Sequence, residues 1–224
     1  MMTNLFSIFD TSTNMIYDMN WISSLSNLLF IPIYYWFFNS KFSYLHIMMI
    51  NLLYNEFKNI LFNKFNKANL IFLISLMLMI FLNNIFGLFP YIFTSSSHLI
   101  FSLSLSLPMW FSLMIFGWIK NTNFMFSHMI PQGTPLILMP FMVLIETISN
   151  IIRPSTLAIR LTANMIAGHL LLTLLSQSAI NQYILISMMI ILIQIILLIL
   201  EFSVSIIQSY VFTILSTLYL KETN

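Results

Sequence analysis

Charged side chains are scarce in this sequence. Of its 224 residues, 6% are charged and 59% are hydrophobic, with 8 basic and 6 acidic side chains. The mean hydropathy is +0.94. A soluble domain carries about 25% charged residues, so this chain has too little charge to solvate a globular surface of its size. The composition therefore indicates an integral membrane protein.

Cysteine is absent, which excludes disulfide frameworks, thiolate metal sites and cysteine nucleophiles. Glycine is nearly absent as well, and the four glycines, Gly87, Gly117, Gly133 and Gly168, do not form a phosphate-binding GxxxxGK[ST] loop. The net charge of +2 comes without any run of Lys or Arg, which excludes a nucleic-acid footprint. We therefore expect no nucleotide, nucleic acid, metal or cofactor to bind to this chain.

Basic residues are missing from the first 20 positions, which contain Asp10 and Asp18. Secretory and transit signals have the opposite charge, so no import signal is predicted here. Met (17) and Phe (22) are abundant while Gly is rare, a bias typical of AT-rich coding. These features favour synthesis in the compartment where the protein works, and mitochondrial synthesis is expected.

Long apolar runs predict an all-α integral membrane protein, a single membrane domain over residues 1–224 with about five crossings. About 20 apolar residues cross a ~30 Å hydrocarbon core. The predicted elements are crossing helices over 19–38, 70–89 and 99–119, an amphipathic surface helix over 41–67, and two long helices over 136–176 and 183–220. At 1.5 Å per residue the last would be about 57 Å long. Ordinary tilts cannot absorb that length, so a strongly inclined helical hairpin is predicted.

Lysine placement predicts the orientation. With the N-terminus outside and the C-terminus inside, all lysines fall on the inner side, as the positive-inside rule requires. These are Lys41, Lys58, Lys64, Lys67, Lys120 and Lys221. The outer connections over 91–98 and 177–182 contain no Lys or Arg. The N-terminus is therefore expected on the outer side and the C-terminus on the inner side, with five crossings.

Ionisable residues at membrane depth gather in the last two predicted helices, at Glu146, Arg153, Arg160, His169 and Glu201. An arginine at the centre of a spanning helix costs about 2.5–3.5 kcal/mol on insertion scales, so such residues indicate function. Glu146, Arg153 and Arg160 are spaced by seven and share one helical face. His169 follows Arg160 by nine residues, about 900° of rotation, and therefore faces the other way.

A second polar stripe repeats every seven residues on the partner helix, at Gln194, Glu201 and Gln208. Two such stripes on adjacent apolar helices indicate a hydrated path or a paired interface. Arg153 either takes part in this path or neutralises Glu146, and Gln194 is best explained by an inter-helix hydrogen bond. No acidic residue lies one turn from Arg160, so its counter-charge is expected on another chain.

Other polar residues have a simpler interpretation. Asn83 and Asn84 are expected to join membrane helices by hydrogen bonding. His46, His98 and His128 lie in interfacial or loop sequence, where no function is expected of them.

The segment RPSTLAIRLTANMIAGHLLLTLL, from Arg153 to Leu175, resembles the signature of subunit a of F-type ATP synthases. The preceding PQGTPLILMPFMVLIETIS and the final IIQSYVFTILSTLYL resemble its mitochondrial form. The resemblance in sequence is close over about the last 90 residues. In the earlier part of the chain the order of the predicted helices agrees with the family more than the sequence does.

The resemblance implies a proton-conducting stator in the Fo sector, not an enzyme on its own, with nucleotide chemistry on other subunits. Its expected partners are the c-ring, the peripheral stalk, other Fo subunits and lipid. Arg160 would face the ring's carboxylate as barrier and counter-ion. The remaining positions would line two offset half-channels: Asn164, His169, Glu201, Gln208 and Glu146, with Arg153 and Gln194 as secondary candidates.

Three alternatives remain open at this stage. A proton-pumping or quinone-interacting subunit of a respiratory complex usually has mid-membrane lysines, which this chain lacks. A membrane cytochrome needs paired histidines in facing spans, and only His169 is deeply placed. A structural anchor has no need for an unpaired buried arginine. Physical reasoning alone does not decide between H⁺ and Na⁺, although His169 and the organellar context favour H⁺.

Overall fold

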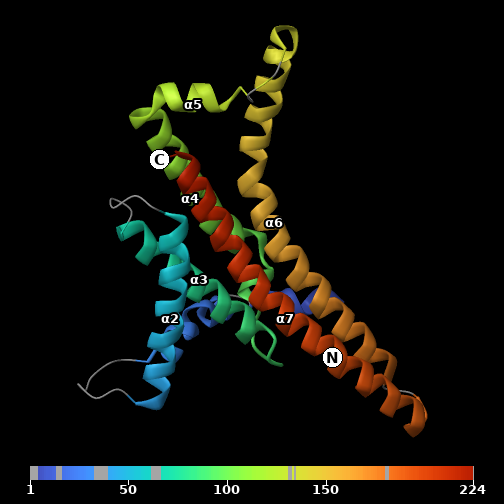
Figure 1. Cartoon of the computed structure of the whole chain (residues 1–224). Helices are drawn as coiled ribbons and strands as arrows, with labels where there is room; N and C mark the ends of the chain where they lie inside the picture. Colours follow the sequence, from blue (N-terminus) through green and yellow to red (C-terminus); the bar gives the residue numbers. More distant parts are fainter. Residues whose placement is uncertain are drawn as a thin grey trace.

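The computed structural model describes residues 5–13, 17–32, 40–61, 67–130, 133, 135–179 and 182–223, and all its regular structure over these residues is helical. Short helical segments come first, and long helices follow (Figure 1). In chain order the elements are η1 (Leu5–Phe9), η2 (Met19–Ile22), α1 (Ser23–Ser26), η3 (Asn27–Phe30), α2 (Lys41–Ile60), α3 (Lys67–Gly87), η5 (Ser95–Ser97), α4 (Leu99–Lys120), α5 (Thr122–His128), η6 (Leu136–Leu138), α6 (Met139–Ala179) and α7 (Ile184–Thr223).

Four helices of the described ranges are long and apolar enough to cross a membrane, at Ala68–Gly87, Leu99–Lys120, Met139–Ala179 and Ile184–Thr223. α4 is helical through its FSLSLSL stretch and through Pro108, even though the alternating pattern resembles a strand. An isolated strand in lipid would leave its backbone groups unpaired, which explains why the helix forms. Together with the composition, these helices make the chain a multi-pass membrane protein.

The crossing helix expected over 19–38 is not one helix in the described residues. Residues 19–30 form three short segments, η2, α1 and η3, and 33–39 lie outside the described ranges. The hydroxyls of Ser24 and Ser26 donate to the carbonyls of Trp21 and Ser23, at 2.8 and 2.6 Å. Such local bonds compete with α-helical pairing, a physical reason for the broken pattern. The described helices therefore include four candidate crossings, where about five were predicted.

The amphipathic helix expected over 41–67 is present as α2 over Lys41–Ile60, and 62–66 lie outside the described residues. Ser40 caps α2 by accepting the backbone N–H of Ser43 at 3.2 Å. Phe57 is fully buried in an apolar cluster that joins α2 to the start of α3 and the end of α7. α2 therefore packs against the membrane helices through its C-terminal half.

Small hydroxyl residues let α7 pack closely against its neighbours. Ser205, Ser209, Thr213 and Thr217 are all buried on one stripe of α7. Each hydroxyl donates to a carbonyl one turn earlier in α7, at 2.7–3.2 Å. The stripe is therefore polar in composition but satisfied in hydrogen bonding, and its short side chains permit close helix contacts.

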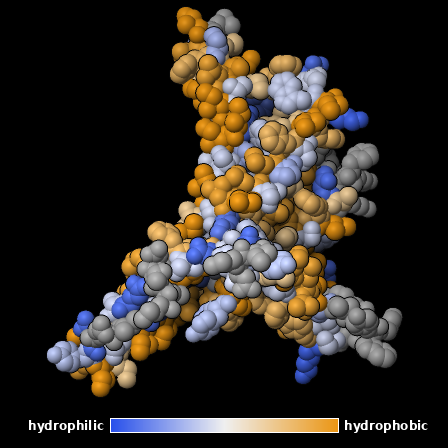
Figure 2. Space-filling model, turned by 180° about the vertical axis from the view of Figure 1, so that it is seen from behind, coloured by the Kyte–Doolittle hydropathy of each residue, from blue (hydrophilic) through white to orange (hydrophobic). Residues whose placement is uncertain are grey.

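α6 and α7 form a long antiparallel hairpin in which α7 lies beside α6 over the hairpin's closed half, while the first turns of α6 diverge (Figure 1). Figure 2 shows this diverging arm as almost continuously apolar, and its exposed residues include Phe141, Leu144 and Ile148. The ends of α4 and α7 meet, because Asn121 donates to the carbonyl of Thr223 at 3.3 Å. Lys120 and Lys221 therefore lie at one end of the helix bundle.

Candidate functional site

A cavity of about 270 Å³ lies between α6 and α7, at the closed half of the hairpin. Its walls are mostly apolar, formed by residues such as Leu88, Leu197 and Val204. Polar groups enter it from Asn164, His169 and Glu201. The structure therefore brings together three of the residues singled out by sequence, two from α6 and one from α7.

Glu201 is the buried carboxylate of this cavity. The residue is 8% exposed, and neither carboxylate oxygen has a hydrogen-bond partner in the described structure. Burying an unpartnered polar group costs free energy, so such a group in a folded protein calls for an explanation. An apolar cavity with one free carboxylate is suited to exchanging a proton with water or with a neighbouring side chain.

Gly168 makes room for that carboxylate, and sequence reasoning missed it. A Cβ atom at Gly168 would lie 2.8 Å from both Cδ and Oε1 of Glu201. The Glu201 side chain therefore rests directly on the α6 backbone. The only available signal was a glycine inside an apolar helix, which costs about 1 kcal/mol relative to alanine and so indicates a packing or functional reason.

Substituting Gly168→Ala should displace the Glu201 carboxylate. Overpacking of this kind costs about 1–3 kcal/mol, and we expect a lower midpoint of thermal denaturation for the purified protein. Gly117→Ala is the matched control, because its Cβ would meet the flexible thioether of Met125, 3.1 Å away. Equal midpoints in the two variants would contradict the role given to Gly168.

His169 lines the same cavity from α6. Its Nε2 is buried without a hydrogen-bond partner in the described structure. The Phe9 ring of η1 packs edge-on against the imidazole, with ring centroids 6.4 Å apart and an interplanar angle of 81°. The second titratable group of the cavity therefore also lacks a hydrogen-bond partner among the described residues.

Arg160 lies on α6 one turn before Asn164 and is not among the residues that line the cavity. Its side chain is exposed, whereas Leu157, Ala158 and Leu161 around it are buried against α3, α4 and α7. It makes no ion pair or hydrogen bond with any residue that the structure describes. The nine-residue spacing from His169 thus separates the two side chains, as the sequence predicts.

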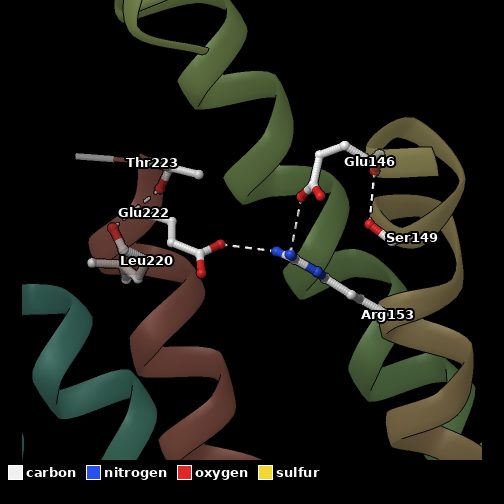
Figure 3. A network of polar contacts seen from close by, with 6 residues as sticks. All are labelled: Glu146, Ser149, Arg153, Leu220, Glu222 and Thr223. Atoms are coloured by element: carbon white, nitrogen blue, oxygen red, sulfur yellow. Dashed lines mark hydrogen bonds and ion pairs between the residues drawn. The ribbon is translucent and has the colours of Figure 1, made fainter. Parts of the chain in front are cut away.

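Arg153 is paired, unlike Arg160 (Figure 3). Its guanidinium contacts Glu146 of α6 at 3.2 Å and Glu222 of α7 at 2.9 Å, and it lies 5.2 Å from the ring centre of Tyr219. The seven-residue spacing predicts one shared face, but the structure joins only Glu146 and Arg153 and leaves Arg160 out. The second acidic partner of Arg153 is Glu222, which sequence reasoning missed because it lies 69 positions away.

The two glutamines of the α7 stripe do not line the cavity. Gln194 and Gln208 are half-buried, and neither lines the space around Glu201. No hydrogen bond joins Gln194 to another described residue, so the inter-helix bond expected for it is absent from the described structure.

A second group of buried polar side chains lies where α3 meets η5 and α4. Asn83 accepts hydrogen bonds from Asn27 and from Ser95, the latter at 3.3 Å, so it does join segments as expected. Asn84 and Ser96 are fully buried, and their side chains have no partner in the described structure. Polar groups of this kind commonly bind ordered water.

His98 belongs to this group, although sequence reasoning gave it no role. Its Nε2 is buried without a partner, and its ring stacks on Phe93 at 5.2 Å and contacts Trp21 at 5.3 Å. The loop that carries His98 contacts α6 through η5. Gly87 of α3 lies between the two, because a Cβ there would be 3.1 Å from Thr94 of the loop and 3.4 Å from Met165 of α6. The buried polar group therefore adjoins the cavity of Glu201, which Leu88 and Met165 line.

The sequence is similar to proteins of a known family. The family described as ATP synthase A chain matches residues 19–221. Three insect proteins named ATP synthase subunit a are similar over their whole lengths. They come from Drosophila melanogaster (53% identity over 224 residues, 100% of both chains), Locusta migratoria (55% over 223 residues, 99% of both chains) and Anopheles gambiae (52% over 227 residues, 100% of both chains). The chain belongs to the ATP synthase A chain family.

Proposed function

We propose that this chain is the proton-translocating stator subunit of the membrane sector of ATP synthase, and that it exchanges protons with a rotating ring of c subunits. The observation that carries the proposal is the division of charge on α6. His169 lines a cavity with Glu201, whose carboxylate has no partner in the described structure. Arg160, on the opposite side of the helix from His169, is exposed and has no ion-pair partner among the described residues.

Glu201 and His169 form the outer half-channel in this proposal. Both are titratable, both are free of fixed partners in the described structure, and they line one cavity with Asn164. The adjoining buried side chains of Asn84, Ser96 and His98 supply water sites toward the lysine-free end. Protons enter through these groups and reach the ring carboxylate.

Arg160 is the counter-ion and barrier. A guanidinium stays protonated in proteins, so it cannot relay a proton. It can stabilise a ring carboxylate that has released its proton, and its fixed charge prevents direct passage between the half-channels. Each proton that falls through 100 mV of membrane potential supplies about 2.3 kcal/mol for rotation.

The inner half-channel lies toward the lysine-bearing end in this proposal. Glu146 receives the released proton there, and Gln208 lies along α7 between this end and the cavity. Arg153 holds Glu146 and Glu222 together at 3.2 and 2.9 Å. These contacts support a positioning role for Arg153 at the inner exit. Gln194, on α7 toward the hairpin's closed end, remains a secondary candidate.

The proposed location is the mitochondrial inner membrane, with the N-terminus in the intermembrane space and the C-terminus in the matrix. The positive-inside rule supports this orientation, because Lys120 and Lys221 share one end of the bundle. The exposed apolar surfaces of α6 and α7 are suited to lipid, to the c-ring and to peripheral-stalk and other Fo subunits.

Cysteine cross-linking tests the proposed partner. The chain has no natural cysteine, so Arg160→Cys or Gln208→Cys introduces a unique thiol. A second cysteine is placed on the ring helix beside its carboxylate, in membranes with the complex intact. We expect efficient cross-links from both positions and none from Leu113→Cys of α4, the control. Absence of cross-links in an intact complex would favour a structural anchor.

A further inference from the structure

The N-terminal helix η1 reaches the proposed proton path. η1 spans Leu5–Phe9 and contacts α6, far along the sequence. Phe9 is half-buried, and its ring meets the imidazole of His169 edge-on at 6.4 Å. Phe6 of the same helix is instead 65% exposed. One aromatic side chain of η1 is therefore directed at the cavity wall, while the other faces away from the protein.

The ring of His169 has no hydrogen-bond partner among the described residues, and Nε2 is buried. The Phe9 contact is also its single ring contact in the described part of the chain. Histidines that transfer protons normally have their orientation fixed by a partner on the other nitrogen. In the described structure the contact that the imidazole makes is instead the T-shaped one with the Phe9 ring.

We propose that Phe9 is a positioning residue for His169, holding the imidazole against the cavity that contains Glu201. This inference rests on the proposed function for its consequence, slower proton transfer when the contact is lost. The contact itself is independent of that function. Edge-to-face aromatic pairs are stabilised by the quadrupoles of the rings, so a ring at position 9 orients the imidazole where an aliphatic side chain only fills space.

Chemical modification of His169 in the assembled complex measures the contact directly. Diethyl pyrocarbonate modifies accessible histidines, and mass spectrometry of the peptides separates His169 from the other histidines of the chain. We expect Phe9→Ala to accelerate modification of His169 by about two- to tenfold, the change that corresponds to losing an aromatic pair of about 0.5–1.5 kcal/mol. Phe6→Ala, the control from the same helix, should leave the rate unchanged.

Proton flux then tests the consequence. Phe9→Ala should slow flux and alter its pH profile, Phe9→Trp should restore both, and Phe9→Leu should restore neither. Phe9→Leu retains a large apolar side chain, so it replaces Phe9→Ala as the test variant if the complex does not assemble with alanine at position 9. Unchanged modification of His169 in Phe9→Ala or Phe9→Leu overturns the contact.

The two proposals fail in different ways. Faster modification with normal flux, while His169→Ala slows flux, overturns the positioning role of Phe9 alone. Normal flux in His169→Ala instead removes His169 from the proton path, and the modification rates still report whether Phe9 holds the ring.

Discussion

Replacing Arg160 with alanine should abolish ATP synthesis driven by a proton gradient, while the membrane still leaks protons passively. An unpaired carboxylate at the membrane centre costs about 2.5–3.5 kcal/mol on insertion scales. Without the guanidinium the ring carboxylate would rarely ionise beside the stator, and the barrier between the half-channels would be lost. ATP synthesis and proton permeability of inner-membrane vesicles, measured on one preparation, check both effects.

Arg153→Ala is the matched control for this substitution, since it removes the other arginine of α6. Arg153 is held by Glu146 and Glu222, whereas Arg160 has no partner among the described residues. We expect the Arg153 variant to retain coupled synthesis at a reduced level. Normal synthesis in Arg160→Ala would remove the counter-ion from the mechanism altogether.

Replacing Glu201 with glutamine should slow proton flux by about 10²-fold or more, the range expected when a positioned proton donor or acceptor is lost. Glutamine has nearly the same shape, so the contact with Gly168 and the assembly of the complex should survive. ATP-driven proton pumping and ATP-synthesis rates in vesicles measure the loss, and the amount of assembled complex is determined in parallel.

Glu222→Gln is the control for this second prediction, because it neutralises another carboxylate of α7 that lies outside the cavity. Its partner Arg153 keeps Glu146, so only a small change in flux is expected. If both glutamine variants pump equally fast, Glu201 does not belong to the relay.

The long hairpin was open to prediction from sequence because its pattern is unusually uniform. Nearly 40 residues, most of them apolar and none of them Gly or Pro, follow Tyr183, and a helix satisfies all the backbone groups of such a segment in lipid. The sequence predicts helices over 136–176 and 183–220, and the structure has them at Met139–Ala179 and Ile184–Thr223. Opposite placement of Arg160 and His169 follows from helical rotation alone.

The N-terminal region was not predictable in the same way. Residues 19–38 are apolar enough to be predicted as a crossing helix. The closely spaced Ser and Asn side chains of this segment, however, donate hydrogen bonds to nearby backbone carbonyls. Long-range contacts were equally inaccessible. Nothing in the local pattern places Phe9 on His169, Glu222 on Arg153, or the Glu201 carboxylate on Gly168.

The polar residues at the turn between α3 and α4 illustrate a different limit. Ser96 and His98 are ordinary residues for a loop, and Asn84 lies in α3. Sequence alone assigns Asn84 to helix packing and His98 to no role. Their meaning depends on burial, because exposed groups of this kind bind bulk water whereas these have no partner in the described structure. Only three-dimensional placement beside the cavity connects them to the proposed proton path.

In the proposed mechanism, two half-channels open to opposite sides of the membrane. Side-specific thiol labelling can separate them, since the chain has no natural cysteine. Val204→Cys reports on the cavity of Glu201, and Asn150→Cys reports on the space beside Arg153. A membrane-impermeant reagent should label Val204→Cys only from the lysine-free side and Asn150→Cys only from the lysine-bearing side. Labelling of both from the same side would contradict the account.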